Sequence, residues 1–148
     1  MRFPSIIVIM AVSSLSVADA GHGSPSRALQ SEGIVHATST AIDGMLKRAR
    51  GPNVTETIAE LKPYVVRIER RAPRPDPAVG AHRGQAEFYY VLDGAAVLVT
   101  GARPNDSSSV ARRERIAKGD VVFIPEDTIH WWDVIEDSIS YIAMRVPR

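Results

Sequence analysis

Apolar and polar residues alternate with a period of two from Tyr64 onward, which is the pattern of a half-buried β-strand. In residues 64–71 the apolar Val66 and Ile68 alternate with the charged Arg67 and Glu69. Further strand-like runs, bounded by Gly, Pro, Asp and Ser, cover residues 87–94, 95–101, 113–120, 121–127, 129–134 and 138–146. Six or more short strands with no helix between them predict an all-β chain, folded as an antiparallel sandwich or barrel.

Turn-forming residues predict how some of these strands connect. Asp93 and Gly94 stand between two apolar runs, a pattern typical of a tight β-hairpin turn. Residues 70–80 are rich in proline, which favours an extended connection leading into the strand that contains Glu87.

The N-terminal residues have the three parts of a secretory signal peptide. A positive residue, Arg2, precedes an apolar stretch at residues 6–17, and small residues follow up to Ala20. The apolar stretch is too short to span a bilayer as a permanent helix. We therefore expect cleavage after Ala20, a secreted or periplasmic mature chain, and no membrane association after cleavage.

The segment that follows is expected to contain one short strand and one short helix. Residues 33–38 read as the strand, and residues 41–50, capped by Ser39 or Thr40, read as a helix with a basic C-terminal end. The expected division of the chain is a signal peptide at 1–20, an N-terminal extension at 21–63 and an antiparallel β-barrel at 64–148.

Composition narrows the chemistry that this chain can perform. The 18 basic residues nearly balance the 17 acidic ones, and no lysine-rich block is present, so nucleic acid is not an expected partner. The chain has no cysteine, which excludes disulfides and thiolate chemistry. Any site must therefore be built from His, Glu, Asp, Tyr or Arg.

One glutamate stands where a buried strand is expected. Glu87 opens the apolar run that continues to Leu92, and an unpaired buried charge costs several kcal/mol or more. His82 precedes Glu87, and His130 begins a later strand. If these strands are neighbours in a closed barrel, two imidazoles and one carboxylate can converge as a three-ligand metal site with open positions. Taken singly, either histidine reads more simply as a surface or core residue.

The spacing of His82 and Glu87 adds a condition. In a regular strand, residues five positions apart point to opposite faces, so both can face inward only if the chain bulges between them. Gly84 is placed to permit this bulge. Gln85 shares the face of Glu87 without any bulge and is a candidate fourth ligand or a group that hydrogen-bonds substrate.

With these residues in place, the chain resembles the cupin superfamily. His82, Glu87 and Gly94 fit the spacing of the first cupin motif, and the resemblance covers residues 64–147. The second motif is matched by Gly119, Pro125 and His130. The resemblance implies a jelly-roll β-barrel and, commonly in this superfamily, a homodimer.

Three positions depart from the family pattern. Gly80 stands where cupins often have a further histidine, so the usual ligand set is reduced to His82, Glu87 and His130. Asp127 replaces the glycine of the second motif, and Asp tolerates the left-handed backbone better than most residues. Val134 replaces a frequent asparagine.

The resemblance implies a divalent metal ion (Zn, Fe, Mn or Ni) and a small organic molecule as ligand. Isomerase, lyase or dioxygenase chemistry is expected, with Glu87 as the catalytic residue. Candidate residues of the substrate pocket are Gln85, Tyr89, Trp132, Tyr141 and Arg145, for which core packing or dimer contacts are the alternative. A non-catalytic module that binds a sugar or other small molecule, or an interaction or storage protein, remains open, and whether the chain is an enzyme is undecided at this point.

Overall fold

The computed structural model describes residues 34–48 and 51–148. It contains one helix, α1 (Ser39–Arg48), and six strands. The strands are β1 (Asn53–Leu61), β2 (Tyr64–Arg71), β3 (Gln85–Thr100), β4 (Arg112–Ala117), β5 (Val121–Ile124) and β6 (His130–Pro147). The expected signal peptide lies outside the described residues.

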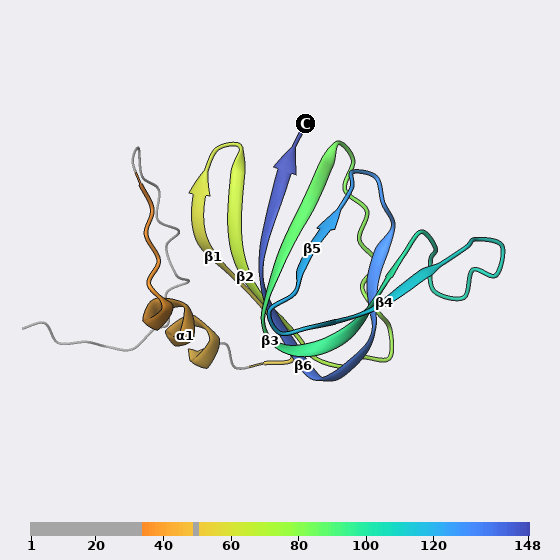
Figure 1. Cartoon of the computed structure of the whole chain (residues 1–148), viewed down its shortest axis with the longest axis horizontal. Helices are drawn as coiled ribbons and strands as arrows, with labels where there is room; N and C mark the ends of the chain where they lie inside the picture. Colours follow the sequence, from red (N-terminus) through yellow and green to blue (C-terminus); the bar gives the residue numbers. More distant parts are fainter. Residues whose placement is uncertain (1–33, 49–50) are drawn as a thin grey trace, which may run out of the picture.

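All strand pairs are antiparallel, and the described strands form one sheet, in the order β1-β2-β6-β3-β4. The short strand β5 pairs with the first half of β3, and β4 pairs with its second half. The sheet does not close by hydrogen bonds, but it curls over on itself (Figure 1). The expected all-β fold with one short helix is confirmed, and its arrangement is consistent with a jelly-roll.

The prediction of a hairpin turn at Asp93 and Gly94 is wrong, because β3 runs through both residues as one strand. The register of β3 against β6 shifts here, and Gly94 adopts a positive φ of 80°. A Cβ atom on Gly94 would lie 1.8 Å from the carbonyl oxygen of Ser138. Glycine is therefore needed here because the backbones of β3 and β6 approach closely where the strand pair bends. In the sequence, a glycine needed for this reason looks the same as a glycine in a turn. The runs at 129–134 and 138–146 are likewise parts of a single strand, β6.

The N-terminal part differs from expectation in two ways. Residues 34–38 form no strand; instead, Thr38 caps α1 by accepting a hydrogen bond from the backbone N–H of Ala41 (3.2 Å). The strand β1, which the sequence pattern did not reveal, pairs with β2 along its whole length. The domain boundary at residue 64 stays an expectation, although β1 belongs to the same sheet as β2.

The core lies between the inner faces of β3, β5 and β6. Val91 and Ile139 are completely buried there, next to Leu98, Ile124 and Ile135. Each such side chain contributes about 1.5–3 kcal/mol when removed from water. This packing fixes β3 against β6, the two strands that carry most of the candidate site.

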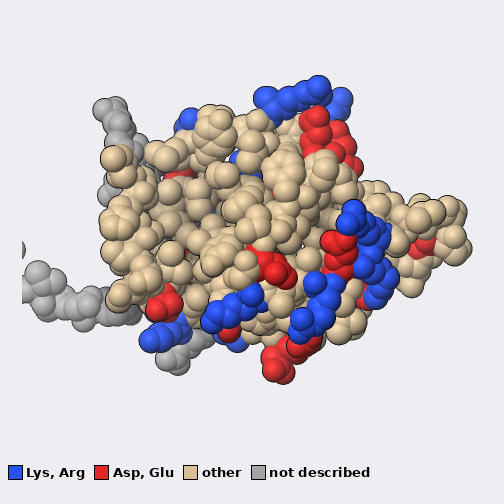
Figure 2. Space-filling view, in the orientation of Figure 1, with Lys and Arg blue, Asp and Glu red and all other residues tan. Residues whose placement is uncertain are grey.

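The surface has no long run of one charge on the face seen in Figure 2, where Lys and Arg lie next to Asp and Glu. Ion pairs join β4 to β6, including Arg113 with Asp133 and Arg115 with Glu136. The helix α1 lies at the β1–β2 end of the molecule, and the 101–111 loop projects from the other end (Figure 1). Among the residues that the structure describes, no helix is long and apolar enough to cross a membrane.

Candidate metal centre

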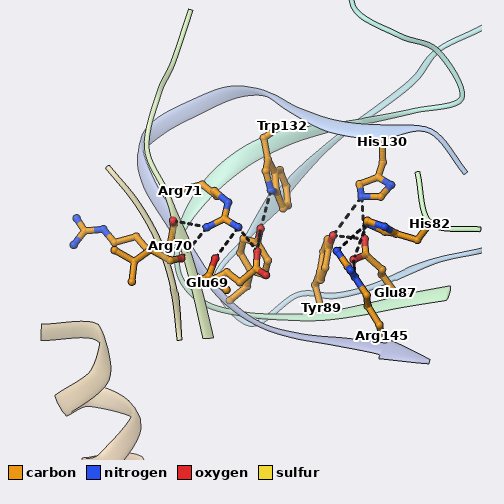
Figure 3. Close-up of polar contacts among 12 residues, drawn as sticks. Glu69, Arg70, Arg71, His82, Glu87, Tyr89, His130, Trp132 and Arg145 are labelled. Atoms are coloured by element: carbon orange, nitrogen blue, oxygen red, sulfur yellow. Dashed lines mark hydrogen bonds and ion pairs between the residues drawn. The ribbon is translucent and has the colours of Figure 1, made fainter. Parts of the chain in front are cut away.

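His82, Glu87 and His130 come together in the structure, as the sequence predicted. Their donor atoms all lie within 4.8 Å of one another. The Nε2 atom of His82 is 3.2 Å from Oε1 of Glu87, and Nε2 of His130 is 2.9 Å from Oε2. Glu87 and His130 are buried, whereas the His82 side chain retains 22% of its exposure. Figure 3 shows the three side chains converging from separate segments.

His82 and Glu87 can face the same site, although they are five positions apart, because a turn and not a bulged strand lies between them. His82 lies before β3 begins at Gln85, and Gly84 forms the turn with a φ of 65°. The carbonyl of His82 accepts hydrogen bonds from the backbone N–H groups of Gln85 (3.3 Å) and Asp127 (3.1 Å). The expectation that Gly84 is needed here is correct, but the expected β-bulge is not.

Asp127 does occupy the left-handed backbone region, with a φ of 59°, in the turn that precedes His130. This turn sets the start of β6, and the Nδ1 atom of His130 lies 2.9 Å from the carbonyl oxygen of Thr128. A backbone contact of this kind fixes the ring orientation and directs Nε2 toward Glu87.

Gly80 is in direct contact with His130. The two residues exchange backbone hydrogen bonds of 2.8 and 2.9 Å, and a Cβ atom on Gly80 would lie 2.5 Å from Nε2 of His130. Real Cβ contacts are longer than this, so the His130 ring takes its position only because residue 80 has no side chain. The family position filled by Gly80 therefore cannot hold a histidine while His130 keeps this orientation.

Burial and hydrogen bonds together set the ionisation of the site. Burial by itself raises the pKa of Glu87, but hydrogen bonds from His130 and Tyr89 outweigh burial and lower that pKa to about 2. Burial lowers the pKa of His130, yet its bonds to Glu87 and to the Thr128 carbonyl raise that pKa above its usual value. Burial dominates at His82 and lowers its pKa. Glu87 is thus a carboxylate with hydrogen-bond donors on both oxygens.

Two further side chains contact Glu87. The hydroxyl of Tyr89 donates to Oε2 (2.6 Å), and Nε of Arg145 donates to Oε1 (3.1 Å). The Nη2 atom of Arg145 also lies 3.2 Å from Nε2 of His82. Both residues were predicted to line the pocket, and the structure places them against the ligand set itself.

A second polar cluster lies beside the first (Figure 3). Trp132 donates from Nε1 to the hydroxyl of Tyr141 (3.2 Å), which donates to Oε2 of Glu69 (3.1 Å). Glu69 also accepts a bond from Arg71 (2.5 Å). Burial raises the pKa of Tyr141 far above its usual value, so its hydroxyl stays protonated. Sequence analysis singled out Trp132 and Tyr141 but missed Glu69 and Arg71, whose only sequence mark is their shared parity in β2.

Both clusters line one cavity of about 210 Å³. Tyr89, Trp132, Tyr141 and Arg145 are among its lining residues, whereas Gln85 is not. Gln85 is the first residue of β3, where it pairs with Pro147 of β6. A larger cavity of about 270 Å³ lies against β4 and β5, but its lining includes no histidine and one carboxylate, Glu114. The candidate metal ligands therefore line the cavity that contains the two clusters.

The donor set of the first cluster fits a divalent metal ion. Two imidazole nitrogens and one carboxylate oxygen suit iron, zinc and related first-row metals, and three protein ligands leave positions open. His82, Glu87 and His130 would hold such an ion, whose identity this donor set does not specify.

No family model matches the chain, and no curated protein matches it at a significant level. Solved structures do match. The cupin domain of Cnp3 from Schizosaccharomyces pombe aligns with a TM-score of 0.54 and 9% identity, covering 67% of each chain. The hydroxypropylphosphonic acid epoxidase of S. wedmorenis aligns with a TM-score of 0.55 and 19% identity, over 64% of this chain and 51% of that one.

An Fe(II) form of HppE aligns with a TM-score of 0.54 and 16% identity, over 64% of this chain and 50% of that one. The chain thus spans about half the length of the epoxidase and HppE chains. At these identities the alignments establish a shared fold.

Proposed function

Because the chain has the cupin fold, we propose that it is a metal-dependent enzyme that acts on a small organic molecule. The observation that carries this proposal is the convergence of His82, Glu87 and His130 within 4.8 Å, at the wall of a cavity of about 210 Å³. The reaction would be of the isomerase, lyase or dioxygenase type. An Fe(II) structure among the proteins of the same fold supports a divalent metal in such a site.

A bound divalent ion would supply Lewis-acid catalysis or, if it is iron, activation of dioxygen. The chain's own residues would bind and orient the ion and the ligand. Glu87 holds charge at the site as a carboxylate, and the hydroxyl of Tyr89 fixes its Oε2 oxygen (2.6 Å). Trp132 and Tyr141, with ring centroids 5.5 Å apart, form an aromatic wall for the carbon skeleton of a ligand. Glu87 is the residue that we assign to catalysis.

A second candidate is a binding module without catalysis. The contact of Arg145 with both Glu87 and His82 favours it, because this guanidinium already neutralises the carboxylate. In that case the cavity would bind a sugar or another small molecule, and the metal would be structural or dispensable.

We also propose that the mature chain is exported and forms a homodimer. The signal-peptide pattern of residues 1–20 supports export. The strands β1 and β4 end the sheet with unpaired edges among the described strands, and such edges are suited to pairing with a second copy. Size-exclusion chromatography with light scattering tests the dimer, and N-terminal sequencing of exported protein tests cleavage after Ala20.

Elemental analysis by inductively coupled plasma mass spectrometry tests the metal site. We expect near-stoichiometric metal in the wild-type protein and its loss in His82→Ala, Glu87→Ala and His130→Ala. His36→Ala is the matched control, because His36 is exposed on the segment before α1 and must leave the metal content unchanged. A protein that stays metal-free after reconstitution, or a Glu87→Ala variant with full metal content, would refute the assignment and favour the binding module.

A further inference from the structure

Arg145 contacts the candidate ligand set and lines the same cavity. Its Nε atom is 3.1 Å from Oε1 of Glu87, and its Nη2 atom is 3.2 Å from Nε2 of His82 (Figure 3). The guanidinium thus contacts two of the three candidate metal ligands. With 40% of its side chain exposed, Arg145 is also accessible from the cavity that it lines.

Arg145 cannot keep its contact with Nε2 of His82 while that atom binds a metal ion. The Nε2 atom of an imidazole has one bonding position, which holds either a proton or a lone pair. It can donate to Glu87 or accept from Arg145, but neither contact survives when the same position binds a metal. Glu87 differs, since each carboxylate oxygen has two lone pairs and can serve a metal and Arg145 together. A metal ion bound at this atom would therefore release the Nη2 end of Arg145 and would leave its Nε end on Glu87.

The charges that line the cavity define what the released guanidinium would bind. Three arginines and two glutamates line it, so a divalent ion leaves the wall with a clear excess of positive charge. Arg71 is already bonded to Glu69 and to the backbone carbonyl of Val54. Arg74 has no ion pair or hydrogen bond to any residue within 34–48 or 51–148. Among the described residues, Arg74 is therefore the cation of this wall without a partner, and a bound metal would add the Nη2 end of Arg145.

We propose that the ligand of this cavity is a small organic acid, and that its carboxylate is bound by Arg145 after metal has displaced the guanidinium from His82. The proposal rests on the metal site of the proposed function and adds the ligand class to it. Guanidinium binds carboxylate through paired, charge-assisted hydrogen bonds. The cavity of about 210 Å³ lies below the roughly 300–1,000 Å³ of pockets for drug-sized ligands, which restricts the acid to a few carbons. Metal and acid then bind synergistically, because each stabilises the same position of Arg145.

Zinc affinity, measured by competition with a chromophoric chelator, tests the competition between Arg145 and metal. Arg145→Gln removes the competing contacts, and we expect it to bind zinc about tenfold or more tightly than the wild type. Arg145→Lys keeps the charge, but a lysine cannot contact both Oε1 of Glu87 and Nε2 of His82, so we expect an intermediate zinc affinity. Arg148→Gln is the control, because Arg148 lies three residues away, pairs with Glu126 and does not line the cavity. Equal or weaker zinc binding by Arg145→Gln would overturn the proposal.

The ligand class is tested on zinc-loaded protein with lactate and its neutral analogue lactamide. We expect lactate, but not lactamide, to raise the melting temperature of the wild type, and Arg145→Gln to remove the difference. Equal effects of the two compounds on the wild type would contradict the assignment to organic acids. If zinc binds the wild type but Arg145→Gln has no higher affinity, the proposed function survives and this inference fails. If neither protein binds zinc, both fail.

Discussion

The contact between Gly80 and His130 makes a sharp prediction about the metal centre. Gly80→Ala places a Cβ atom 2.5 Å from Nε2 and 2.7 Å from Cε1 of His130. The backbone of residue 80 is held by two hydrogen bonds to His130, so the imidazole ring must move instead. Its movement breaks the contact of 2.9 Å between Nε2 and Oε2 of Glu87.

The size of the effect follows from this lost contact. A hydrogen bond to a charged group contributes about 1.5–3 kcal/mol, and replacing glycine by alanine returns about 0.4–1 kcal/mol through the unfolded chain. We therefore expect Gly80→Ala to lower the free energy of unfolding of the metal-free protein by about 1–2 kcal/mol. Its metal content should also fall, because the Nε2 atom no longer points at Glu87.

A double-mutant cycle separates this mechanism from a general backbone effect. Urea denaturation in the presence of EDTA is measured for the wild type, Gly80→Ala, His130→Ala and the double variant. In the His130→Ala background the ring is absent, so Gly80→Ala should be neutral or stabilising by up to about 1 kcal/mol. An equal loss of stability in both backgrounds would refute the reasoning, because the clash with the ring would then not be the cause.

Substitutions at three further positions test the fold around the site by the same urea assay. Gly94→Ala should cost more than about 3 kcal/mol, because its Cβ would lie 1.8 Å from the Ser138 carbonyl oxygen; a near-neutral result would mean that the β3–β6 approach is wrong. Asp127→Gly should change stability by less than about 1 kcal/mol, whereas Asp127→Val should lose about 1–2 kcal/mol. The reason is that only the branched side chain disfavours a φ of 59°. Equal effects of the two substitutions would argue against this backbone conformation. Tyr141→Phe should cost about 1 kcal/mol through the bond to Glu69, and a stabilised variant would contradict that bond.

The three candidate metal ligands could be predicted from sequence because local patterns mark each of them. Glu87 is a charged residue at the start of an apolar run, and His130 follows a glycine, a strand and a proline at the spacing of the second cupin motif. The fold class followed from period-two alternation, which is a local property of each strand. The direction of His82 was harder to predict, because the turn at Gly84 separates it from β3 and the alternation of side chains along a strand does not apply across that turn.

What the sequence did not reveal depends on pairing between distant strands. Glu69 meets Tyr141 because β2 and β6 pair at that register, and Arg145 meets Glu87 because β6 and β3 do. No local pattern carries a register between segments that are dozens of residues apart. The bent strand at Gly94 was misread for a related reason, since glycine followed by an apolar run is the same in a turn and in a bulge.

Gly80 and Arg145 together explain why the candidate site offers three protein ligands and not four. A side chain at position 80 would occupy the space of the His130 ring, so a fourth ligand from this position and the present orientation of His130 exclude each other. The carboxylate of Glu87 then needs further neutralisation, and Arg145 supplies it at 3.1 Å from Oε1. The same guanidinium lines the cavity. The absence of a side chain at position 80 and the approach of Arg145 to Glu87 are therefore linked features of one site, and both agree with the proposal that Arg145 binds an acidic ligand.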